Sequence, residues 1–595
     1  MYSPIETMGV VETSLGKIKG SSQRSKFGKS YFSFKGIPYA QPPLGDLRFA
    51  KPVPIAPWTN ILDLSRNKES PACWQVNPLF PESDSRFLMK GQEDCLYLNV
   101  FTHKLPEEDV QSLPVIFWIH GGAFTVESND SRMYGPDLLL EHDVVLVTIN
   151  YRLGPFGFLA LGNEAGNQGM HDQVTALKWV QSHISAFGGD PQNVTIMGES
   201  AGGMSCMLHL VSPLSQGLFH KVIALSGAGS TPFLHNDRKP QHYARAAAKK
   251  LVGAEDYTDE ELLAKLRSVP AKKIATLPTM FKDWDSTLPV CFKPCLDPQD
   301  GDEAFMPIPF VQAVQEGKVN TQIPVFTGCC SHEGLILSVP FRKHSNRWIP
   351  FFKDWNKWAA HLFFNREAEL LSDEDREKSL KIRDKFFPQV TNHNLVPPKN
   401  DSNHQALEQC LSTSIWHAPM INDAKMLAER GSQVFVYEFS YRGTMTLADV
   451  FRLSLVKMGM NFGARHIGLK LFQKDLGVCH GDDMFFYFTC KPFGMPPGLK
   501  TDTDKKVSQV FLNFVTSFAA HGHPGSQEDQ EWKALNTSEE LQIMTIDKSL
   551  SFGPISADRL NKVQFWLDEV QPNEKGHAWS DQPVGILHEK IATKR

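Results

Sequence analysis

The residues best suited to chemistry lie in one short stretch, Gly198-Glu199-Ser200-Ala201-Gly202. It follows the β-branched run Val194–Ile196 and precedes the helix-compatible stretch Met204–Leu210. This order of strand, tight turn and helix is what a G-x-S-x-G nucleophile elbow requires. Only glycines fit at the two flanks of such a turn, which lifts the serine hydroxyl clear of the backbone. The pattern predicts that Ser200 is a nucleophile.

A serine nucleophile needs donors for the negative charge that develops on the substrate oxygen. His120-Gly121-Gly122 follows an apolar strand that is predicted to end at Ile119, which is the usual place of an oxyanion loop. Glycine lets the backbone turn its N–H groups toward a developing alkoxide. We predict an oxyanion hole made by the amides of Gly121, Gly122 and Ala201, each contributing on the order of 3–4 kcal/mol in acyl transfer.

The base should be a histidine that lies beyond the acid, because the chain order in this architecture is serine, acid, histidine. Among 21 histidines the best placed is His480, in a glycine-flanked loop after the strand Val434–Phe439 and before a helix expected at Phe485–Phe488. His466, in a segment with helical character, is the alternative. Position alone leaves both open.

The acid should follow a core strand between the serine and the histidine. Glu333 lies just after the strand Pro324–Gly328 and meets this condition. Its carboxylate would fix the tautomer of the histidine and stabilise the imidazolium. Asp482 and Asp483 are too close to His480 in the chain for this task.

The elements that must position these residues follow the pattern of a parallel sheet. Pro114–Ile119 and Val144–Ile149 are near-continuous apolar runs, as in strands covered on both faces. A helix is expected over 172–187, where apolar residues recur at intervals of three and four. The alternation of strands and helices predicts an α/β protein with a large, mostly parallel central sheet and helices on both faces. Helical insertions are expected at about 235–320 and 341–425, within a single domain over 1–595.

Several further motifs accompany the elbow in order along the chain. They are Phe34–Ala40, Glu93–Val100, His120–Phe124, Tyr151–Gly154, Phe187–Pro191 and Gly198–Gly202. Together they resemble the type-B carboxylesterase/cholinesterase family from about Val10 to Leu567, and in detail the intracellular detoxifying carboxylesterases of arthropods. The resemblance implies an α/β-hydrolase fold and a catalytic triad of Ser200, Glu333 and His480. The chain departs from the usual oxyanion loop at Ala123, where a third glycine is common.

The resemblance also carries structural expectations. Glu199 and Ser226 match positions beside the nucleophile. Arg48 with Glu93, and Arg152 with Asp172, match buried ion pairs. Cys73 and Cys95 match the family's first disulfide, although a chain without a secretory leader would be expected to keep both as free thiols.

Composition narrows the function further. The chain has 595 residues and a formal net charge of -5, and this negative charge does not indicate a protein that binds nucleic acid. No apolar run reaches the roughly 18 residues of a spanning helix. The N-terminal residues lack the pattern of a signal peptide. We therefore expect a cytoplasmic enzyme, or a secreted one if a leader was removed, and leave monomer and dimer open. The sequons at Asn129, Asn193, Asn400 and Asn536 matter only on the secretory route.

The expected activity is hydrolysis of carboxylic esters through an acyl-enzyme on Ser200, with no metal or cofactor. The expected role is detoxification of xenobiotic or lipophilic esters, including insecticides. Organophosphates and carbamates are the expected covalent inhibitors. Phe124, Trp348 and the region 458–462 would set selectivity. One alternative is a juvenile hormone esterase, although that group usually carries Gln where Glu199 stands. The other is a non-catalytic binding protein like the neuroligins, which an intact triad opposes.

Overall fold

The protein is described here from a computed structural model. It describes residues 9–76, 89–106, 111–161, 164–234, 240–253, 257–278, 290–297, 303–342, 348–364, 371–390, 402–444, 446–449, 475–490 and 499–570. The alternative base His466, the sequon at Asn400 and the region 458–462 lie outside these residues.

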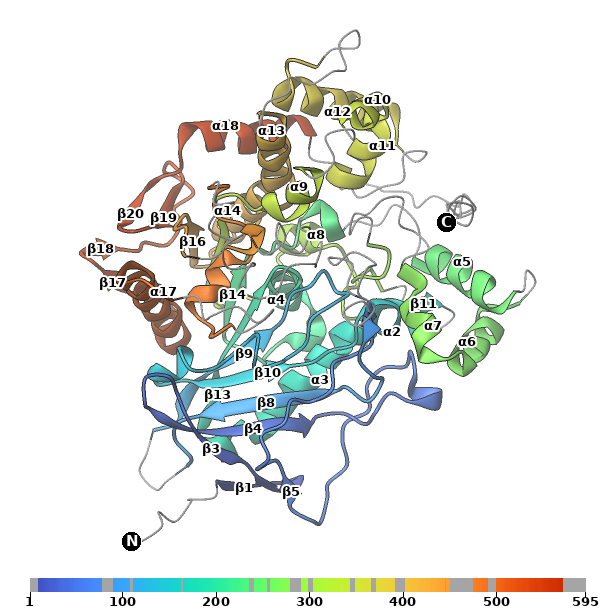
Figure 1. Cartoon of the computed structure of the whole chain (residues 1–595), viewed down its shortest axis with the longest axis vertical. Helices are drawn as coiled ribbons and strands as arrows, with labels where there is room; N and C mark the ends of the chain where they lie inside the picture. Colours follow the sequence, from blue (N-terminus) through green and yellow to red (C-terminus); the bar gives the residue numbers. More distant parts are fainter. Residues whose placement is uncertain are drawn as a thin grey trace, which may run out of the picture.

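An 11-stranded sheet forms the centre of the molecule (Figure 1). Its strands, from one edge to the other, are β20 (Leu550–Pro554), β19 (Gln542–Ile546), β16 (Val434–Phe439), β15 (Val325–Cys330), β14 (Lys221–Leu225), β13 (Gly189–Glu199), β9 (Leu113–Ile119), β10 (Val145–Ile149), β8 (Tyr97–Thr102), β4 (Ser30–Pro38) and β3 (Ser21–Arg24). The pairings from β19 to β10 are parallel, and those at both edges are antiparallel. The prediction of a mostly parallel sheet is confirmed.

The apolar strands separate two cores. Alternate residues of β9 point to opposite faces, so that Phe117 joins one buried cluster and Trp118 joins the other. The helices α3 (Gln168–His183) and α4 (Ala201–Val211) contribute side chains to the first cluster. Helix α17 (Asp502–His521) contributes to the second. Helices therefore cover both faces, which is why the central strands are apolar along their whole length.

Most remaining helices form two groups at the periphery of the sheet, and their buried side chains join the first cluster (Figure 1). The first comprises α5 (Pro240–Val252), α6 (Asp259–Ser268) and α7 (Ala271–Ala275), drawn in green beside the sheet. The second comprises α10 (Trp348–Lys353), α11 (Trp355–Ala359), α12 (Asp373–Phe386) and α13 (Ser402–Leu411), at the end of the molecule opposite the N-terminal strands. The other α-helices of the described residues are α2 (Gly154–Phe158), α8 (Phe310–Gln315), α9 (Leu335–Arg342), α14 (Ala418–Glu429) and α18 (Ala557–Phe565). The single-domain organisation stays a prediction.

Short strands complete the described chain. They are β1 (Val10–Thr13) with β2 (Gly16–Lys19) and β5 (Leu62–Asp63), β6 (Gln75–Val76) with β7 (Met89–Lys90), β11 (Ala160–Leu161) with β12 (Glu164–Ala165), and β17 (Ser526–Gln527) with β18 (Gln530–Glu531). Strands β1 and β2 pair antiparallel and form an N-terminal hairpin. None of the helices in the described part of the chain is both long and apolar enough to cross a bilayer.

The C-terminal half adds two strands to the sheet and corrects one expectation. The sheet continues beyond Val434–Phe439, because β19 pairs with that strand in parallel and β20 follows at the edge. The expected helix at Phe485–Phe488 is instead a 3₁₀ turn over Asp482–Phe486 that begins directly after the His480 loop. That turn draws Asp482 and Asp483 into the interior.

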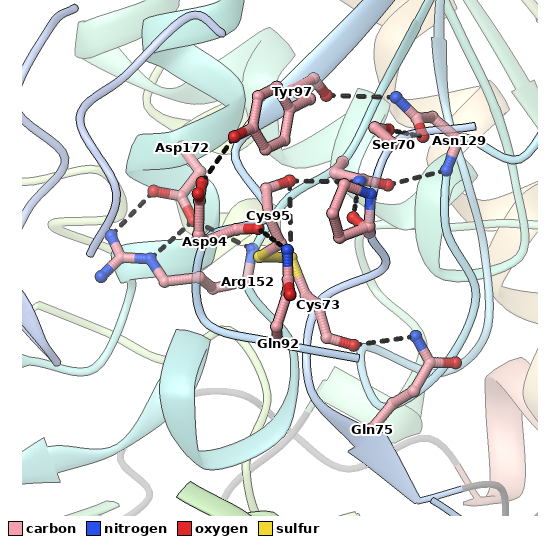
Figure 2. The surroundings of a disulfide bond; sticks show 12 residues. Ser70, Cys73, Gln75, Gln92, Asp94, Cys95, Tyr97, Asn129, Arg152 and Asp172 are labelled. Atoms are coloured by element: carbon pink, nitrogen blue, oxygen red, sulfur yellow. Dashed lines mark hydrogen bonds and ion pairs between the residues drawn. A yellow bond between two sulfur atoms is a disulfide. The ribbon is translucent and has the colours of Figure 1, made fainter. Parts of the chain in front are cut away.

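Two buried ion pairs and a disulfide hold the loops beside the sheet. Arg152 pairs with Asp172 through Nε–Oδ2 at 2.8 Å and Nη2–Oδ1 at 2.7 Å, and Arg48 makes a two-pronged contact with Glu93 at 2.6 Å. Cys73 and Cys95 form a disulfide, so the expectation of free thiols is not met (Figure 2).

The sequons differ in accessibility. Asn129 lies near this disulfide, is 1% exposed, and its Nδ2 donates to the carbonyl of Tyr97 at 3.2 Å (Figure 2). Its amide is already used inside the fold, so Asn129 offers no site for glycosylation of the folded protein. Asn536 is exposed.

Candidate active site

Ser200 stands at the junction of β13 and α4 in a strained conformation. Its φ of 58° and ψ of -123° are rarely adopted by a residue with a side chain. Its amide donates to the carbonyl of Leu225 at 2.9 Å, and its own carbonyl accepts from Met204 at 2.8 Å. The end of β14 and the first turn of α4 therefore hold the turn, and the side chain is half-buried rather than enclosed.

The glycines of the elbow are required by close packing. A Cβ at Gly198 would lie 2.8 Å from the carbonyl oxygen of Ile119, and one at Gly202 would collide with the same oxygen. The elbow thus presses directly onto the end of β9, where the oxyanion loop begins. Strand β9 and the elbow position Gly121 and Ser200 against each other: a Cβ at Gly121 would lie 3.1 Å from the Cβ of Ser200.

The three predicted donors lie on the elbow and on the loop that packs against it. Ala201 is the first residue of α4, so the helix itself leaves its amide without a partner. Within the described residues, no acceptor takes a hydrogen bond from the amide of Gly121 or Gly122. Ala123 continues the loop at a φ of 55°, a conformation that a glycine would adopt with less strain. These amides are free to bind an anionic oxygen.

Glu333 is fully buried in the loop after β15 and accepts three hydrogen bonds. Its Oε2 lies 2.5 Å from Nδ1 of His480. Its Oε1 accepts from the Ser226 hydroxyl and from the Cys330 amide, each at 2.6 Å. The predicted acid and base are therefore in contact, and Ser226 fixes the carboxylate from β14. With Nδ1 bonded to a carboxylate, His480 presents Nε2 on its other side.

Nε2 of His480 faces the elbow and lies 3.1 Å from Oε1 of Glu199. The ring also packs against Trp416, with centroids 4.9 Å apart. Among the residues that the structure describes, no hydrogen bond joins the Ser200 hydroxyl to His480. Catalytic hydrogen bonds are often long in free enzymes and shorten when substrate binds. The structure thus places His480 beside Glu199, the neighbour of Ser200.

The charges of this pair depend on each other. Burial raises the pKa of Glu199 to about 8, although the charge of His480 opposes the rise. Burial lowers the pKa of His480, but the carboxylates of Glu199 and Glu333 outweigh it and raise the pKa to about 9. The two groups therefore titrate above neutral pH, in steps that belong to the pair.

Sequence reasoning missed two acidic groups behind the site. Asp483 is fully buried, accepts from the Tyr437 hydroxyl at 2.9 Å, and burial raises its pKa to about 7. Asp482 accepts from the amides of Leu447 and Cys479 at 2.6 and 2.7 Å and so pins the His480 loop. The pair was visible beside His480 in the sequence, but only its burial reveals this role.

A third buried carboxyl supports Glu333 from α13. Glu408 accepts from the Ser412 hydroxyl at 2.6 Å, and that hydroxyl accepts from the Gly334 amide at 2.8 Å. Burial raises the pKa of Glu408 to about 7. No local pattern marked Glu408 or Ser412, because both contact the site from a helix far along the chain.

The other histidines near the site do not suit proton transfer. Burial lowers the pKa of His120 to about 4, and its Nδ1 lies 3.0 Å from the carbonyl oxygen of Gly121. Burial also lowers the pKa of His417 well below its usual range. The His120 ring belongs to the loop that carries the oxyanion donors, and Nε2 of His417 lies 3.0 Å from the carbonyl oxygen of Cys330, at the end of β15.

Two of the residues expected to set selectivity are buried in aromatic contacts. Phe124 packs edge-to-face on Phe158 with centroids 5.4 Å apart, and Trp348 stacks on Phe352 at 5.7 Å. Both side chains are at most 5% exposed. Their effect on selectivity stays a prediction.

Comparisons with known proteins agree with this geometry. The model of the carboxylesterase family matches residues 7–566. The chain is 31% identical to juvenile hormone esterase of Tribolium castaneum over 587 residues, covering 96% of this chain and 94% of that protein. It is 31% identical to esterase E4 of Myzus persicae over 533 residues, covering 88% of each.

A solved structure is similar over the same length. It is the crystal structure of juvenile hormone esterase from Manduca sexta with OTFP covalently attached, with a TM-score of 0.76 and 26% identity, covering 94% of this chain and 99% of that one. The fold is therefore that of the α/β hydrolases. By its family model, its relatives and its fold, the chain belongs to the carboxylesterase family and is a carboxylic ester hydrolase.

Proposed function

We propose that ester hydrolysis proceeds by two-step acyl transfer on Ser200. The observation that carries the proposal is the contact between Glu333 and His480, made beside an elbow whose oxyanion amides are free. His480 takes the proton of the Ser200 hydroxyl through Nε2 as the oxygen attacks the ester carbonyl. The negative charge collects on the substrate oxygen, within reach of the amides of Gly121, Gly122 and Ala201.

Collapse of this intermediate releases the alcohol, which takes the proton from His480. Water then attacks the acyl-enzyme in the same way, and the acid leaves. Glu333 stabilises the imidazolium and is itself held by the Ser226 hydroxyl and the Cys330 amide. These residues carry out every step without a metal or an organic cofactor.

The proposed substrates are lipophilic carboxylic esters of foreign origin, including insecticides, with organophosphates and carbamates as covalent inhibitors. The similarity to esterase E4 and to other enzymes named simply as esterases supports a broad activity. The second candidate is juvenile hormone hydrolysis, which the two juvenile hormone esterases among the relatives favour. Glu199 favours the first candidate, because juvenile hormone esterases usually carry Gln at the matching position.

The catalytic assignment is tested with a diethyl organophosphate added in equimolar amount. We expect complete loss of turnover of a chromogenic short-chain ester, and one diethylphosphoryl group on the peptide that contains Ser200. Ser200→Ala should take up no label and should lose about 10⁶-fold in kcat. Glu333→Gln should keep the fold and lose about 10⁴-fold. A label on another residue, or turnover retained by Ser200→Ala, would overturn the assignment.

The substrate is tested by comparing kcat/KM for 1-naphthyl acetate, a pyrethroid ester and juvenile hormone III. Broad activity on the first two with weak turnover of the third is the result expected for a detoxifying enzyme. A preference of more than about 100-fold for juvenile hormone, roughly 2.7 kcal/mol in transition-state binding, would establish the second candidate.

The cytoplasmic location is likewise a proposal. The disulfide between Cys73 and Cys95 bears on it, because disulfides persist mainly in oxidising compartments. Fractionation of cells that express the full chain, together with mass mapping of both cysteines, distinguishes a cytoplasmic from a secretory location. Protein in the cytosolic fraction with free thiols supports the proposal, and bridged protein in the secretory fraction contradicts it.

A further inference from the structure

The turn that carries the oxyanion donors has an unusual backbone. Gly122, Ala123, Phe124 and Glu127 all have positive φ values, of 89°, 55°, 58° and 87°. Residues with a side chain rarely adopt this region, and they persist in it only where the surrounding structure holds them. Contacts from outside the turn must therefore fix its shape, because only the glycine adopts such a φ without a steric cost.

The turn closes on itself at Gly122. The carbonyl of Gly122 accepts from the amides of Thr125 and Val126, at 2.9 and 3.1 Å, and from the Thr125 hydroxyl at 3.1 Å. A Cβ at Gly122 would collide with the carbonyl oxygen of Val126, so the peptide unit that joins Val126 to Glu127 packs directly against Gly122. The position of the Gly122 amide, one of the predicted oxyanion donors, therefore depends on where that peptide unit lies.

Gln75 holds this peptide unit from outside the turn. Its Oε1 accepts from the amide of Glu127 at 3.0 Å, and its Nε2 donates to the carbonyl of Glu127 at 2.8 Å. One side-chain amide thus binds both backbone polar groups of a residue with positive φ. The same Nε2 donates to the carbonyl of Cys73 at 3.1 Å, which fixes the orientation of the side chain (Figure 2).

The surroundings of Gln75 make this contact rigid. The residue is 4% exposed, and a buried hydrogen bond is stronger than one that competes with water. Gln75 lies on β6, where it is paired in antiparallel register with Lys90 of β7. Backbone pairing therefore positions the side chain in addition to the nearby disulfide.

We propose that Gln75 is a positioning residue for ester hydrolysis, which holds the peptide unit between Val126 and Glu127 and thereby fixes the Gly122 amide in the oxyanion hole. The inference rests on the acyl-transfer mechanism proposed above, in which that amide stabilises the negative charge of the tetrahedral intermediate. Oxyanion donors act because they are in place before the charge develops. A displaced turn should therefore lower kcat more than it changes KM.

The test compares two substitutions of Gln75. Gln75→Met keeps the length of the side chain and removes both contacts with Glu127, whereas Gln75→Glu keeps an acceptor for the Glu127 amide and loses the Nε2 donor. Gln92 supplies the matched controls Gln92→Met and Gln92→Glu. Its side chain is exposed, and its Nε2 donates to the carbonyl of Asp94 at 3.0 Å beside the same disulfide (Figure 2).

Two constants are measured for each variant. The first is kcat for a chromogenic short-chain ester per active site, with the sites counted by titration with the diethyl organophosphate so that only folded enzyme contributes. The second is the inhibition constant of octyl trifluoromethyl ketone. Oγ of Ser200 adds to the carbonyl carbon of this ketone, the serine proton passes to His480, and the carbonyl oxygen becomes the oxyanion of a tetrahedral adduct. A purely structural role of Gln75 would change the free energy of unfolding and neither constant.

We expect kcat to fall about 10–100-fold in Gln75→Met and about 3–10-fold in Gln75→Glu, with KM within about threefold of the wild-type value. The inhibition constant of the ketone should rise by the factor by which kcat/KM falls, and both Gln92 variants should match the wild type.

A wild-type kcat in Gln75→Met, or a loss confined to KM or to stability, would contradict the inference. If Gln75→Met gives no folded protein, the same comparison between Gln75→Glu and Gln92→Glu decides it. Wild-type enzyme that the organophosphate does not label at Ser200 would instead contradict the mechanism on which the inference rests.

Discussion

Oε1 of Glu199 lies 3.1 Å from Nε2 of His480, the imidazole nitrogen that must receive the serine proton. The carboxyl next to the nucleophile therefore acts on the base directly. Because the negative charges of Glu199 and Glu333 favour the imidazolium, they hold the pKa of His480 above its ordinary value. The base works only when unprotonated, so kcat/KM rises as the pH rises through this pKa.

This arrangement predicts the behaviour of Glu199→Gln. Glutamine cannot carry the negative charge, so His480 should release its proton at lower pH. The acidic limb of the pH profile of kcat/KM should therefore shift to lower pH relative to the wild-type enzyme. The measurement is turnover of a neutral ester between pH 5 and pH 10. An unshifted limb would mean that Glu199 keeps its own proton while His480 titrates.

The oxyanion loop predicts a loss of turnover in Gly121→Ala. The new methyl group would lie 2.7 Å from the backbone oxygen of Glu199, so the loop must move away from the elbow. We expect kcat to fall by about 10²–10³-fold with a smaller change in KM, because the donors act on the transition state. Gly553→Ala is the control, since a Cβ there meets no atom within 4 Å. Equal kinetics in both variants would argue against the assigned donors.

The buried carboxyl of Asp483 predicts that the variant Asp483→Asn is more stable than the wild type by an amount that depends on pH. Burial raises its pKa from 3.8 to about 7, so the folded chain keeps a proton that the unfolded chain has lost. Stability therefore falls as the pH rises from about 4 to 7. Asn at this position accepts from Tyr437 without titrating. Relative to wild type, Asp483→Asn should gain about 2–3 kcal/mol more at pH 8 than at pH 5.

Urea unfolding at both pH values measures this difference. Glu540→Gln replaces an exposed carboxyl and should show no change between them. A gain in Asp483→Asn that is equal at both pH values would show that Asp483 is ionised in the folded protein.

The disulfide between Cys73 and Cys95 predicts how far its reduction lowers the free energy of unfolding. It closes a loop with a sequence separation of 22, for which the chain-entropy model gives about 3 kcal/mol. Cys73→Ser should lower the unfolding free energy by this amount, and a reductant should destabilise the wild type equally. Ser200 lies elsewhere, so ester turnover of the folded variant should stay near the wild-type level. Unchanged stability would mean that the two thiols are unlinked in solution.

The sequence was most informative where local patterns fix the backbone. The apolar runs that became β9 and β10 and the spacing of three and four in α3 located these elements within a few residues. It was least informative for β19, whose five residues Gln542–Ile546 are too short for a clear alternation. That strand belongs to the sheet because it pairs with β16, which lies about a hundred residues earlier.

The sequence by itself determined the chemistry that this protein can perform. The glycines around Ser200 and the loop at Gly121 are visible in the sequence because turn geometry constrains residue type, whereas the choice of His480 over His466 came from the family resemblance. Only the tertiary structure decided how the groups are held and charged. The contacts of Glu333 with Ser226, of Glu199 with His480 and of Glu408 with Ser412 arise from packing. Their pKa values depend on burial, which no local pattern specifies.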